Sequence, residues 1–383
     1  MVATEYIESG ATTGLAGLLE DSPRFDYSGG ASCPSLLLEP SRTNLIGYSE
    51  YFEGTGWVKE SGATIESNVD SSPDGNTNAS YLKAPIATNS TIRIKYTFSC
   101  TSSQTYVGSI FVKKENVDFI RILSTGATAS TLEAFYNVSN GTLGSSGTPS
   151  KAIIEDYGNG WYRLSLVIDA VNTSSSATFR VQLAKTDGAV IDNFDGTEKN
   201  LIFGGQLEQA SYPTSYIPNH SGGSVTRAAD VNTLLNQSGV IGQTEGTIYV
   251  NWIATEHSSN SQIFDIGNGN VDRITLIHNS NNSLRVLVRT NNTSIIDYTE
   301  SSAIVGGNTY KAAFSYSDSS GYAFYLNGSK LTDGTDRVDF STSVDDIYMN
   351  STFTDSNKEK NNYKQFLLFD TRISDNNLAT LTS

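Results

Sequence analysis

The sequence has few cysteines, few histidines and no long apolar run, and each shortage excludes a class of protein. Cys33 and Cys100 are the only cysteines in 383 residues, far fewer than a disulfide scaffold contains, and the sequence leaves open whether they form a bridge. No apolar run of about eighteen residues occurs, and the first residues lack the basic and apolar parts of a secretory signal. We therefore expect a soluble protein that is made in a cytoplasm and does not insert into a membrane.

Positive charge is also scarce. The chain carries 25 Lys and Arg residues against 40 Asp and Glu residues, which gives a net charge of -15 and a pI of about 4.6. A field of that sign repels phosphate backbones, whereas sequence-independent nucleic-acid binding needs the opposite sign. We expect no nucleic-acid partner.

Catalytic motifs are missing as well. No strand carries the closely spaced carboxylates that glycoside hydrolysis uses, and no nucleophile has a recognisable base or nucleophile elbow around it. The histidines, at positions 220, 257 and 278, do not stand at zinc-ligand spacing from a cysteine or from one another. These absences predict that the protein is not an enzyme and has no catalytic residues.

What the chain does contain is short strands separated by turn residues. Residues 91–98 alternate apolar side chains at positions 92, 94, 96 and 98 with polar ones at 93, 95 and 97, the period of two typical of a strand with one wet face. Similar strands are predicted at 106–112, 119–123, 161–167, 178–183, 247–253, 284–289, 310–316 and 322–326. Asn327-Gly328 predicts a tight hairpin, because both residues tolerate positive φ.

This pattern predicts an all-β protein with two antiparallel β-sandwich (jelly-roll) domains in tandem after an extended N-terminal arm. We expect the arm over residues 1–38, where alternation is weak, and the first sandwich over 39–218. A polar, glycine-rich linker over 219–230 then leads to the second sandwich, 231–383.

Two phrases bracket the first predicted sandwich. They are Pro-Ser-Leu-Leu-Leu-Glu-Pro-Ser-Arg-Thr-Asn-Leu at 34–45, and Gln-Leu-Glu-Gln-Ala-Ser-Tyr-Pro-Thr-Ser-Tyr-Ile-Pro at 206–218 followed by Thr-Arg-Ala-Ala-Asp at 226–230. Together with interior phrases at 49–52, 109–113 and 158–163, they resemble carbohydrate-binding-module-like domains of bacteriophage tail fibres, head fibres and tailspikes. The resemblance covers about residues 24 to 230.

The second predicted sandwich resembles concanavalin A-like or laminin-G-like domains. The resemblance rests on Gly-Thr-Ile-Tyr-Val-Asn-Trp at 246–252, the hairpin phrase at 324–330, and residues 369–381, which fit a closing strand and a short helix. Ser374 is also a plausible cap for that helix. This scaffold carries lectins, glycan lyases and structural modules, so the resemblance implies a fold more than a ligand.

The resemblance implies a phage virion structural protein, a fibre or surface appendage assembled in the host cytoplasm. The arm would contact other virion proteins, and the sandwiches would adhere to host cell-surface glycans; fibres of these families are similar in being homotrimers. Two alternatives stay open: a purely structural capsid or tail decoration protein, and a polysaccharide depolymerase. The host, the glycan and the place on the particle are not determined by the sequence.

Candidate glycan-binding residues are one aromatic and three basic side chains. Trp57 lies in a glycine-flanked loop where its ring could pack on a pyranose, whereas Trp161 and Trp252 lie within strands and are expected in the core. Arg93, Lys95, Arg121 and also Lys113 could form a basic stripe for an acidic glycan; the alternative is that such strand cations keep a face soluble.

Calcium is the one cofactor that we consider. Asp265, Asn268, Asn270 and Asp272 form an oxygen-rich loop, and oxygen ligands suit this ion. A second loop of this kind contains Asp187, Asp192, Asn193 and Asp195. For each loop the alternative is an ordinary turn rich in Asp and Asn.

Overall fold

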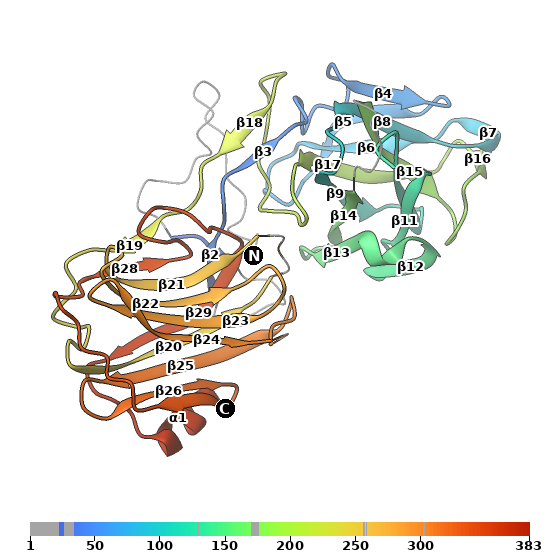
Figure 1. The fold of residues 1–383 in the computed structure, drawn as a ribbon. Helices are drawn as coiled ribbons and strands as arrows, with labels where there is room; N and C mark the ends of the chain where they lie inside the picture. The colour runs from blue at the N-terminus through green and yellow to red at the C-terminus, as the bar shows by residue number, and fades with distance from the viewer. Residues whose placement is uncertain are drawn as a thin grey trace. The chain divides into compact units, whose positions relative to one another are not determined.

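The computed structural model describes residues 23–26, 34–128, 130–169, 176–255, 257, 259–301 and 303–383 (Figure 1). The described chain divides into two compact units. The first is Ser41–Ala228, and the second is built from Pro23–Asp26, residues 34–40 and Ala229–Ser383. Each unit is a sandwich of antiparallel sheets, which confirms the predicted all-β fold.

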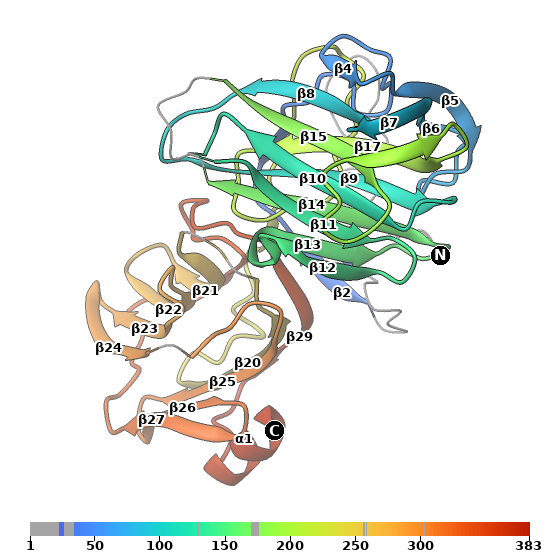
Figure 2. The ribbon, with the colours of Figure 1, turned by 90° about the vertical axis from the view of Figure 1, so that its right-hand side faces the viewer.

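One sheet of the first sandwich, which we call the β8 sheet, has six strands; Figure 2 shows β8, β15, β10 and β11 lying side by side. Its strands in spatial order are β12 (Thr142–Gly147), β11 (Leu132–Asn137), β10 (Phe119–Thr125), β15 (Ser176–Ala184), β8 (Arg93–Ser99) and β4 (Trp57–Glu60). A 3₁₀ turn, Pro149–Lys151, follows β12.

The facing β9 sheet also has six strands. In order they are β13 (Ala152–Asp156), β14 (Trp161–Asp169), β9 (Thr105–Lys114), β17 (Lys199–Glu208), β6 (Ala79–Lys83) and β5 (Thr64–Asp70). Alternate residues of both sheets meet in one core, for example Ile94 and Phe179 from the β8 sheet with Ile110 and Leu164 from the β9 sheet. The other face of β9 is buried too, because Phe111 joins an aromatic cluster on the outside.

The bracketing phrases of the first sandwich hold its two ends together. Strand β3 (Arg42–Asn44) pairs with β18 (Val225–Arg227), and the buried Asn44 donates from Nδ2 to the carbonyl of Ile217 at 2.8 Å. Gln206 accepts from the backbone of Ile217 at 2.6 Å. Asn44, Gln206 and Ile217 are buried and hydrogen-bonded within the fold, so the phrases that carry the resemblance help to stabilise the first sandwich. A second small pair joins β7 (Ile86–Ser90) to β16 (Asp192–Asp195).

The second sandwich has a seven-stranded β20 sheet and a six-stranded β22 sheet. The β20 sheet runs β1 (Phe25–Asp26), β2 (Ser35–Leu38), β29 (Asn361–Phe369), β20 (Glu245–Ile253), β25 (Thr309–Ser317), β26 (Gly321–Leu326) and β27 (Ser329–Gly334). The β22 sheet runs β19 (Asn232–Leu234), β28 (Asp346–Met349), β21 (Ser261–Asn268), β22 (Asp272–His278), β23 (Leu284–Thr290) and β24 (Thr293–Glu300). Trp252 lies fully buried between them, as predicted.

Part of the predicted arm belongs to this second sandwich. Strand β2 pairs with β29 in the register Leu36 to Tyr363, and β1 pairs with β2. The buried guanidinium of Arg24 donates to Glu39 at 2.9 Å and also bonds Asp230. In sequence, the first sandwich is thus inserted between two parts of the second. The rest of the arm, 1–22 and 27–33 with Cys33, lies outside the described residues, while Cys100 is buried.

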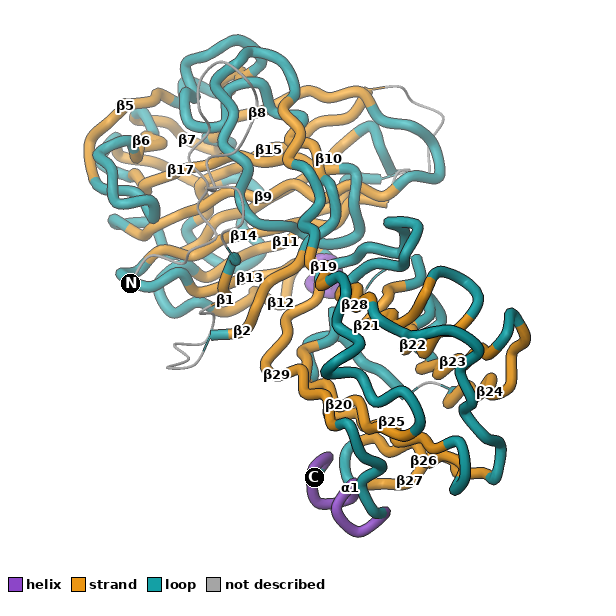
Figure 3. The backbone as a smooth tube through the Cα atoms, turned by 90° about the vertical axis from the view of Figure 1, so that its left-hand side faces the viewer, coloured by secondary structure: helices purple, strands orange, loops and turns teal. Residues whose placement is uncertain are grey.

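Two local predictions at the C-terminal end are confirmed. Asn327 and Gly328 have φ of 47° and 80° and connect β26 to β27 as a two-residue turn. Helix α1 (Asp375–Thr382) packs on β25, β26 and β27 (Figure 3). Ser374 is its N-cap residue, but its side chain makes no capping hydrogen bond.

Candidate functional site

Three of the predicted glycan-binding residues share the outward face of the β8 sheet. Arg93 and Lys95 point away from the core because they alternate with the buried Ile94. Gln182 stands between Arg93 and Arg121 in the register, so the two arginines flank one glutamine. Arg93, Lys95 and Arg121 of the predicted basic stripe therefore lie close together on this face.

The structure adds a fourth cation, Arg180, which sequence reasoning missed. Arg180 is paired in register with Lys95 on the neighbouring strand. Strand alternation gives the direction of Arg180, but its place beside Lys95 follows from pairing between strands some 85 residues apart. Lys113, the other member of the predicted stripe, lies on β9 in the opposite sheet.

Two carboxylates partly neutralise these cations. Glu60 bonds the side chain of Arg93 and lies 2.8 Å from the ammonium of Lys95. Burial opposes ionisation of Glu60, but the hydrogen bonds from Lys95 and Arg93 lower its pKa overall. Arg121 donates from Nε to Glu133 at 2.7 Å and is almost fully buried.

Trp57 does not offer an exposed ring. It is 6% exposed and packs between Phe52 and Tyr96, with ring centroids 5.2 and 5.3 Å away. Its indole N–H donates to the carbonyl of Tyr48 at 2.8 Å. The glycine-flanked loop that suggested exposure ends at Gly56, and Trp57 then begins β4, which turns its ring into the core. We correct the prediction accordingly: Trp57 is a core residue.

The predicted calcium loop is already filled with hydrogen-bond donors. The buried Asp272 accepts from Asn291, Ser341 and Thr342, and these bonds, against the effect of burial, lower its pKa to about 2. Asp265 forms an ion pair with Arg273 at 2.7 Å; burial nevertheless raises its pKa to about 6.

The two amides of that loop are also engaged. Asn270 accepts from Arg273 and Arg289, and Asn268 donates to the carbonyl of Ser343 at 3.4 Å. Donors occupy the side-chain oxygens of Asp265, Asn270 and Asp272 that a cation would need, so the geometry favours the alternative, a turn held by hydrogen bonds.

The second acidic loop is built in the same manner. Asp187 accepts from the backbone of Ser145 at 2.7 Å, and Asp192 accepts from the backbone of Lys185 at 3.0 Å. Asp195 accepts from Thr197, and Asn193 accepts from Asn89. Within the described part of the chain, no group of three or more His, Cys, Asp or Glu side chains is arranged to hold a metal ion.

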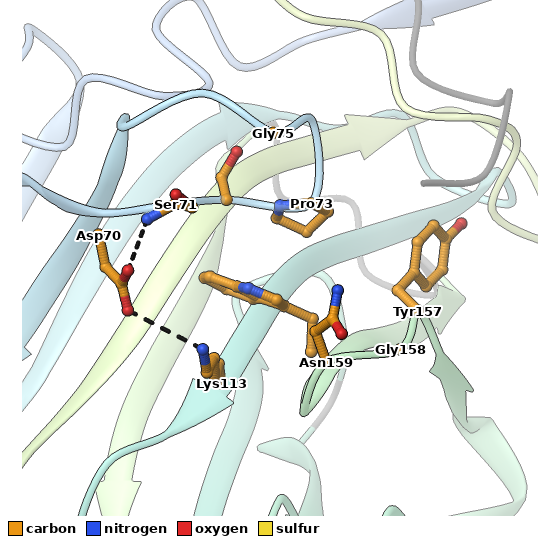
Figure 4. Close-up of a pocket in the computed structure, with 10 residues that line it drawn as sticks. Asp70, Ser71, Pro73, Gly75, Lys113, Tyr157, Gly158 and Asn159 are labelled. Carbon is orange, nitrogen blue, oxygen red and sulfur yellow. Dashed lines mark hydrogen bonds and ion pairs between the residues drawn. The ribbon is translucent and has the colours of Figure 1, made fainter. Parts of the chain in front are cut away.

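A pocket of about 220 Å³ opens on the outward side of the β9 sheet (Figure 4). Trp161 and Lys113 are register partners on β14 and β9 and line it from the sheet. The remaining lining residues are Asp70, the last residue of β5, and members of two loops: Ser71, Ser72, Pro73 and Gly75 after β5, and Tyr157, Gly158 and Asn159 before β14. Sequence reasoning missed this pocket, although its loops carry visible Pro-Asp-Gly and Gly-Asn-Gly turn signals.

The pocket combines aromatic and polar groups. Trp161 is 3% exposed, as predicted for a core ring, whereas Tyr157 is partly exposed and packs edge-on to Phe111 at 4.8 Å. Lys113 lies 3.9 Å from Asp70, as the dashed line in Figure 4 marks. Asp70 supplies a carboxylate to the lining, and Lys113 supplies an ammonium group.

A largely buried carboxyl group, that of Glu50, is hydrogen-bonded to the loop beside the pocket. Glu50 accepts hydrogen bonds from the Tyr216 hydroxyl at 3.0 Å and from the Asn78 amide at 3.2 Å. Burial, with a contribution from Asp74, raises the pKa of Glu50 to about 7. Asn78 also donates to Asp74 at 2.9 Å, which ties the 72–78 loop to this carboxyl.

The histidines form no catalytic arrangement with the pocket. His220 lies 3.6 Å from Glu50, outside the pocket lining. In the second sandwich His257 and His278 pack edge-on with ring nitrogens 2.7 Å apart. Burial and the neighbouring His257 lower the pKa of His278 to about 4.

Comparison with known proteins assigns no family to this chain. No protein-family model matches the sequence, and no curated protein matches it. Among the described residues, no helix has the length and apolar character needed to cross a membrane.

Several solved structures are similar to part of the chain. The CBM40 domain of Ruminococcus gnavus IT-sialidase bound to alpha2,3 sialyllactose is 15% identical, with 40% of this chain and 97% of that chain covered at a TM-score of 0.33. A SAP-like pentraxin from Limulus polyphemus is 14% identical over 40% of this chain and 76% of its own, at 0.32. The binding domain of botulinum neurotoxin DC in complex with rat synaptotagmin II is 15% identical over 36% and 35%, at 0.30. Similarity at this level identifies neither a ligand nor a partner for this chain.

Proposed function

We propose that this chain is a bacteriophage virion protein, part of a fibre or surface appendage, that binds host cell-surface glycans without cleaving them. The observation that carries the binding part is the pocket of the first sandwich. Its volume equals that of roughly seven water molecules, which suits a single sugar ring. Its lining offers both an apolar surface and hydrogen-bonding groups, the combination that sugar recognition requires.

Each kind of group in the pocket has a role in this proposal. The Tyr157 ring presents an apolar surface to the C–H groups of a pyranose. The Lys113 ammonium donates to sugar hydroxyls, and the Asn159 amide both donates and accepts. Asn159 is exposed with φ of 52°, so its side chain stands at the tip of a tight turn.

The virion part of the proposal is supported by the two bracketing phrases, which resemble those of phage fibre and tailspike domains. In this proposal the arm attaches the chain to other virion proteins, and a homotrimer presents several copies of the pocket. A single millimolar site contributes only about 4 kcal/mol, but linked copies raise avidity by about 10² to 10⁴. Mass spectrometry and imaging of purified phage particles test the virion part of the proposal. If the particles do not contain the protein, this part is wrong.

The binding part is tested with two pocket variants of the full chain. Lys113→Met keeps the apolar stem and removes the charge, and Asn159→Gly removes the amide while keeping the positive φ accessible. We expect the double variant to lose about tenfold or more of the binding that a glycan array reveals for the intact chain.

Lys151→Met is the matched control. Lys151 is 38% exposed against 33% for Lys113, and it pairs with Asp169 at the end of β14 that is remote from the pocket. An array that stays blank with the intact, assembled protein refutes glycan binding. Equal losses in the double variant and in the control would remove the pocket from the proposal.

A second candidate function is a purely structural decoration protein. It is favoured by the burial of all three tryptophans, which are 6%, 3% and 0% exposed, because a sugar platform normally exposes its ring. Unchanged host adsorption by particles that carry the double pocket variant would favour this candidate.

A further inference from the structure

The outward strand face of the β8 sheet carries more positive than negative charge, in a chain whose net charge is -15. Its outward strand residues include four cations, Arg93, Lys95, Arg121 and Arg180, and two carboxylates, Glu60 and Glu133. Asp187, in the loop that follows β15, accepts hydrogen bonds from Ser145 and Ser146. The face therefore keeps an excess of two positive charges on its strands.

Hydroxyl groups border these cations. Three threonines are register partners across neighbouring strands: Thr97, Thr178 and Thr125. They lie on the same face, two residues along the strands from the pair Lys95 and Arg180. Thr125 and Thr178 share a hydrogen bond of 2.9 Å between their hydroxyls. A row of hydroxyls beside a row of cations can meet the hydroxyl and carboxylate groups of one acidic sugar.

Arg180 is the cation with the least complete set of partners. Its Nη1 donates to the hydroxyl of Thr125 at 3.0 Å, and its Nε, although buried, has no hydrogen-bond partner among residues in the described ranges. The Nε atom lies 3.7 Å from Glu60, which Arg93 and Lys95 already engage. Burial lowers the pKa of Arg180, and the positive charges of Arg93 and Arg121 add to this effect.

We propose that this face is a second glycan site, separate from the pocket, which takes a carboxylate-bearing sugar unit. Arg180 and Lys95 contact the carboxylate, since a guanidinium fork matches a planar carboxylate and an ammonium adds a point charge. Arg93 and Arg121, held by Glu60 and Glu133, strengthen the field without moving. The threonine row binds the sugar hydroxyls.

This inference rests on the proposed function, because it takes the ligand to be a glycan, but it concerns a different site. The proposed function and this inference can be refuted separately. If the chain binds no sugar at all, both are wrong. If it binds neutral sugars through the pocket and shows no preference for acidic ones, only this inference is wrong.

The experiment is a calorimetric titration of the full chain with trigalacturonic acid and, separately, with its methyl ester. We expect the acid to bind about tenfold or more tightly than the ester, because the ester keeps every hydroxyl and loses the charge. Arg180→Gln and Lys95→Gln should each remove about tenfold of the affinity for the acid and leave the affinity for the ester unchanged.

Lys83→Gln is the control, an ion-paired lysine of the β9 sheet that is 39% exposed. Lys95→Gln keeps the test decisive if Arg180→Gln fails to fold, which its thermal unfolding curve would show. Equal affinity for acid and ester, equal losses in the control, or loss of acid binding in the Lys113→Met, Asn159→Gly variant instead would each overturn the inference.

Discussion

The two sheets of the first sandwich share one core but differ on their outward faces. On the outward face of the β9 sheet, the side chains of Phe111 and Phe203 are buried by Tyr216, which belongs to the segment that follows β17. On the β8 sheet, Arg93 and Lys95 stay partly exposed with side-chain exposures of 20% and 23%. The outward face of the β9 sheet carries a second small core with a pocket beside it, whereas the outward face of the β8 sheet carries charged side chains.

This difference shows how one scaffold offers two kinds of surface. A strand that is buried on both faces reads as a continuous apolar run, as in β9, whereas a strand with one wet face alternates, as in β8. The covered face gains stability and shape from its aromatic cluster. The uncovered face keeps partly solvated ion pairs, and pairs of this kind contribute little to stability.

The largest expected effect is on stability. Phe111→Ala removes a ring that contacts Tyr157, Phe203 and Tyr216, and we expect it to lower the free energy of unfolding of the first sandwich by about 3–5 kcal/mol. Lys95→Ala should cost less than about 1 kcal/mol, because its ion pair is partly solvated. Urea unfolding followed by hydrogen exchange in β9 and β20 measures the loss and locates it. Similar losses in the two variants would contradict the comparison.

The next effect is a pH dependence of opposite sign on the two sides. The folded-state pKa of Glu50, about 7, lies above its ordinary 4.5, so folding favours the protonated form. This contribution is fully present below pH 4.5, is lost as the pH rises through 7, and amounts to at most about 3 kcal/mol. Glu60 on the β8 sheet has a lowered pKa, so its contribution is lost as the pH falls through that value.

Melting temperatures at pH 5 and pH 8 test the sign. The Glu50 carboxyl should make the wild-type chain lose stability between these pH values relative to Glu50→Gln, while His278, whose pKa is lowered, acts in the opposite sense and equally in both chains. Glu66→Gln, an exposed glutamate of the same β9 side, is the control and should behave as wild type. A Glu50→Gln variant with the full wild-type change in stability would refute the role given to this carboxyl.

The smallest effect is the response of binding to salt. Raising the salt from about 0.05 to 0.5 M shortens the Debye length about threefold, so trigalacturonate binding at the β8 face should weaken several-fold. Binding of a neutral sugar at the pocket should change by less than about twofold. Calorimetry at the two salt concentrations measures both, and equal weakening would erase the electrostatic distinction between the faces.

The strands could be predicted because their signals are local. Alternation over 91–98 and the Asn327-Gly328 turn depend on neighbouring residues only, and both are present in the structure. The burial of Trp161 and Trp252 followed from strand patterns in the same way. The prediction for Trp57 was wrong because the glycines that precede it indicate a loop, whereas Trp57 is the first residue of strand β4.

The sites could be predicted only in part, because they depend on which strands pair. Arg93, Lys95 and Arg121 were found as cations on wet strand positions, but the position of Arg180 beside Lys95 requires the register between β15 and β8. The pocket joins two loops about 85 residues apart. The pairing of β2 with β29 spans more than 300 residues and involves a strand of four residues, too short to show a period.

The insertion of the first sandwich into the sequence of the second has a practical consequence for the exchange of domains between proteins. The two segments that connect the sandwiches are hydrogen-bonded to each other: β3 pairs with β18, and the backbone N–H of Asp230 donates to the carbonyl of Glu39 at 2.9 Å. Residues 41–228 can therefore be cut out as a cassette and replaced by a short turn, or by another domain whose ends are adjacent, while β2 still completes the sheet beside β29. A chain built in this way can take up a different inserted domain through a single exchange of sequence and keep its second sandwich unchanged.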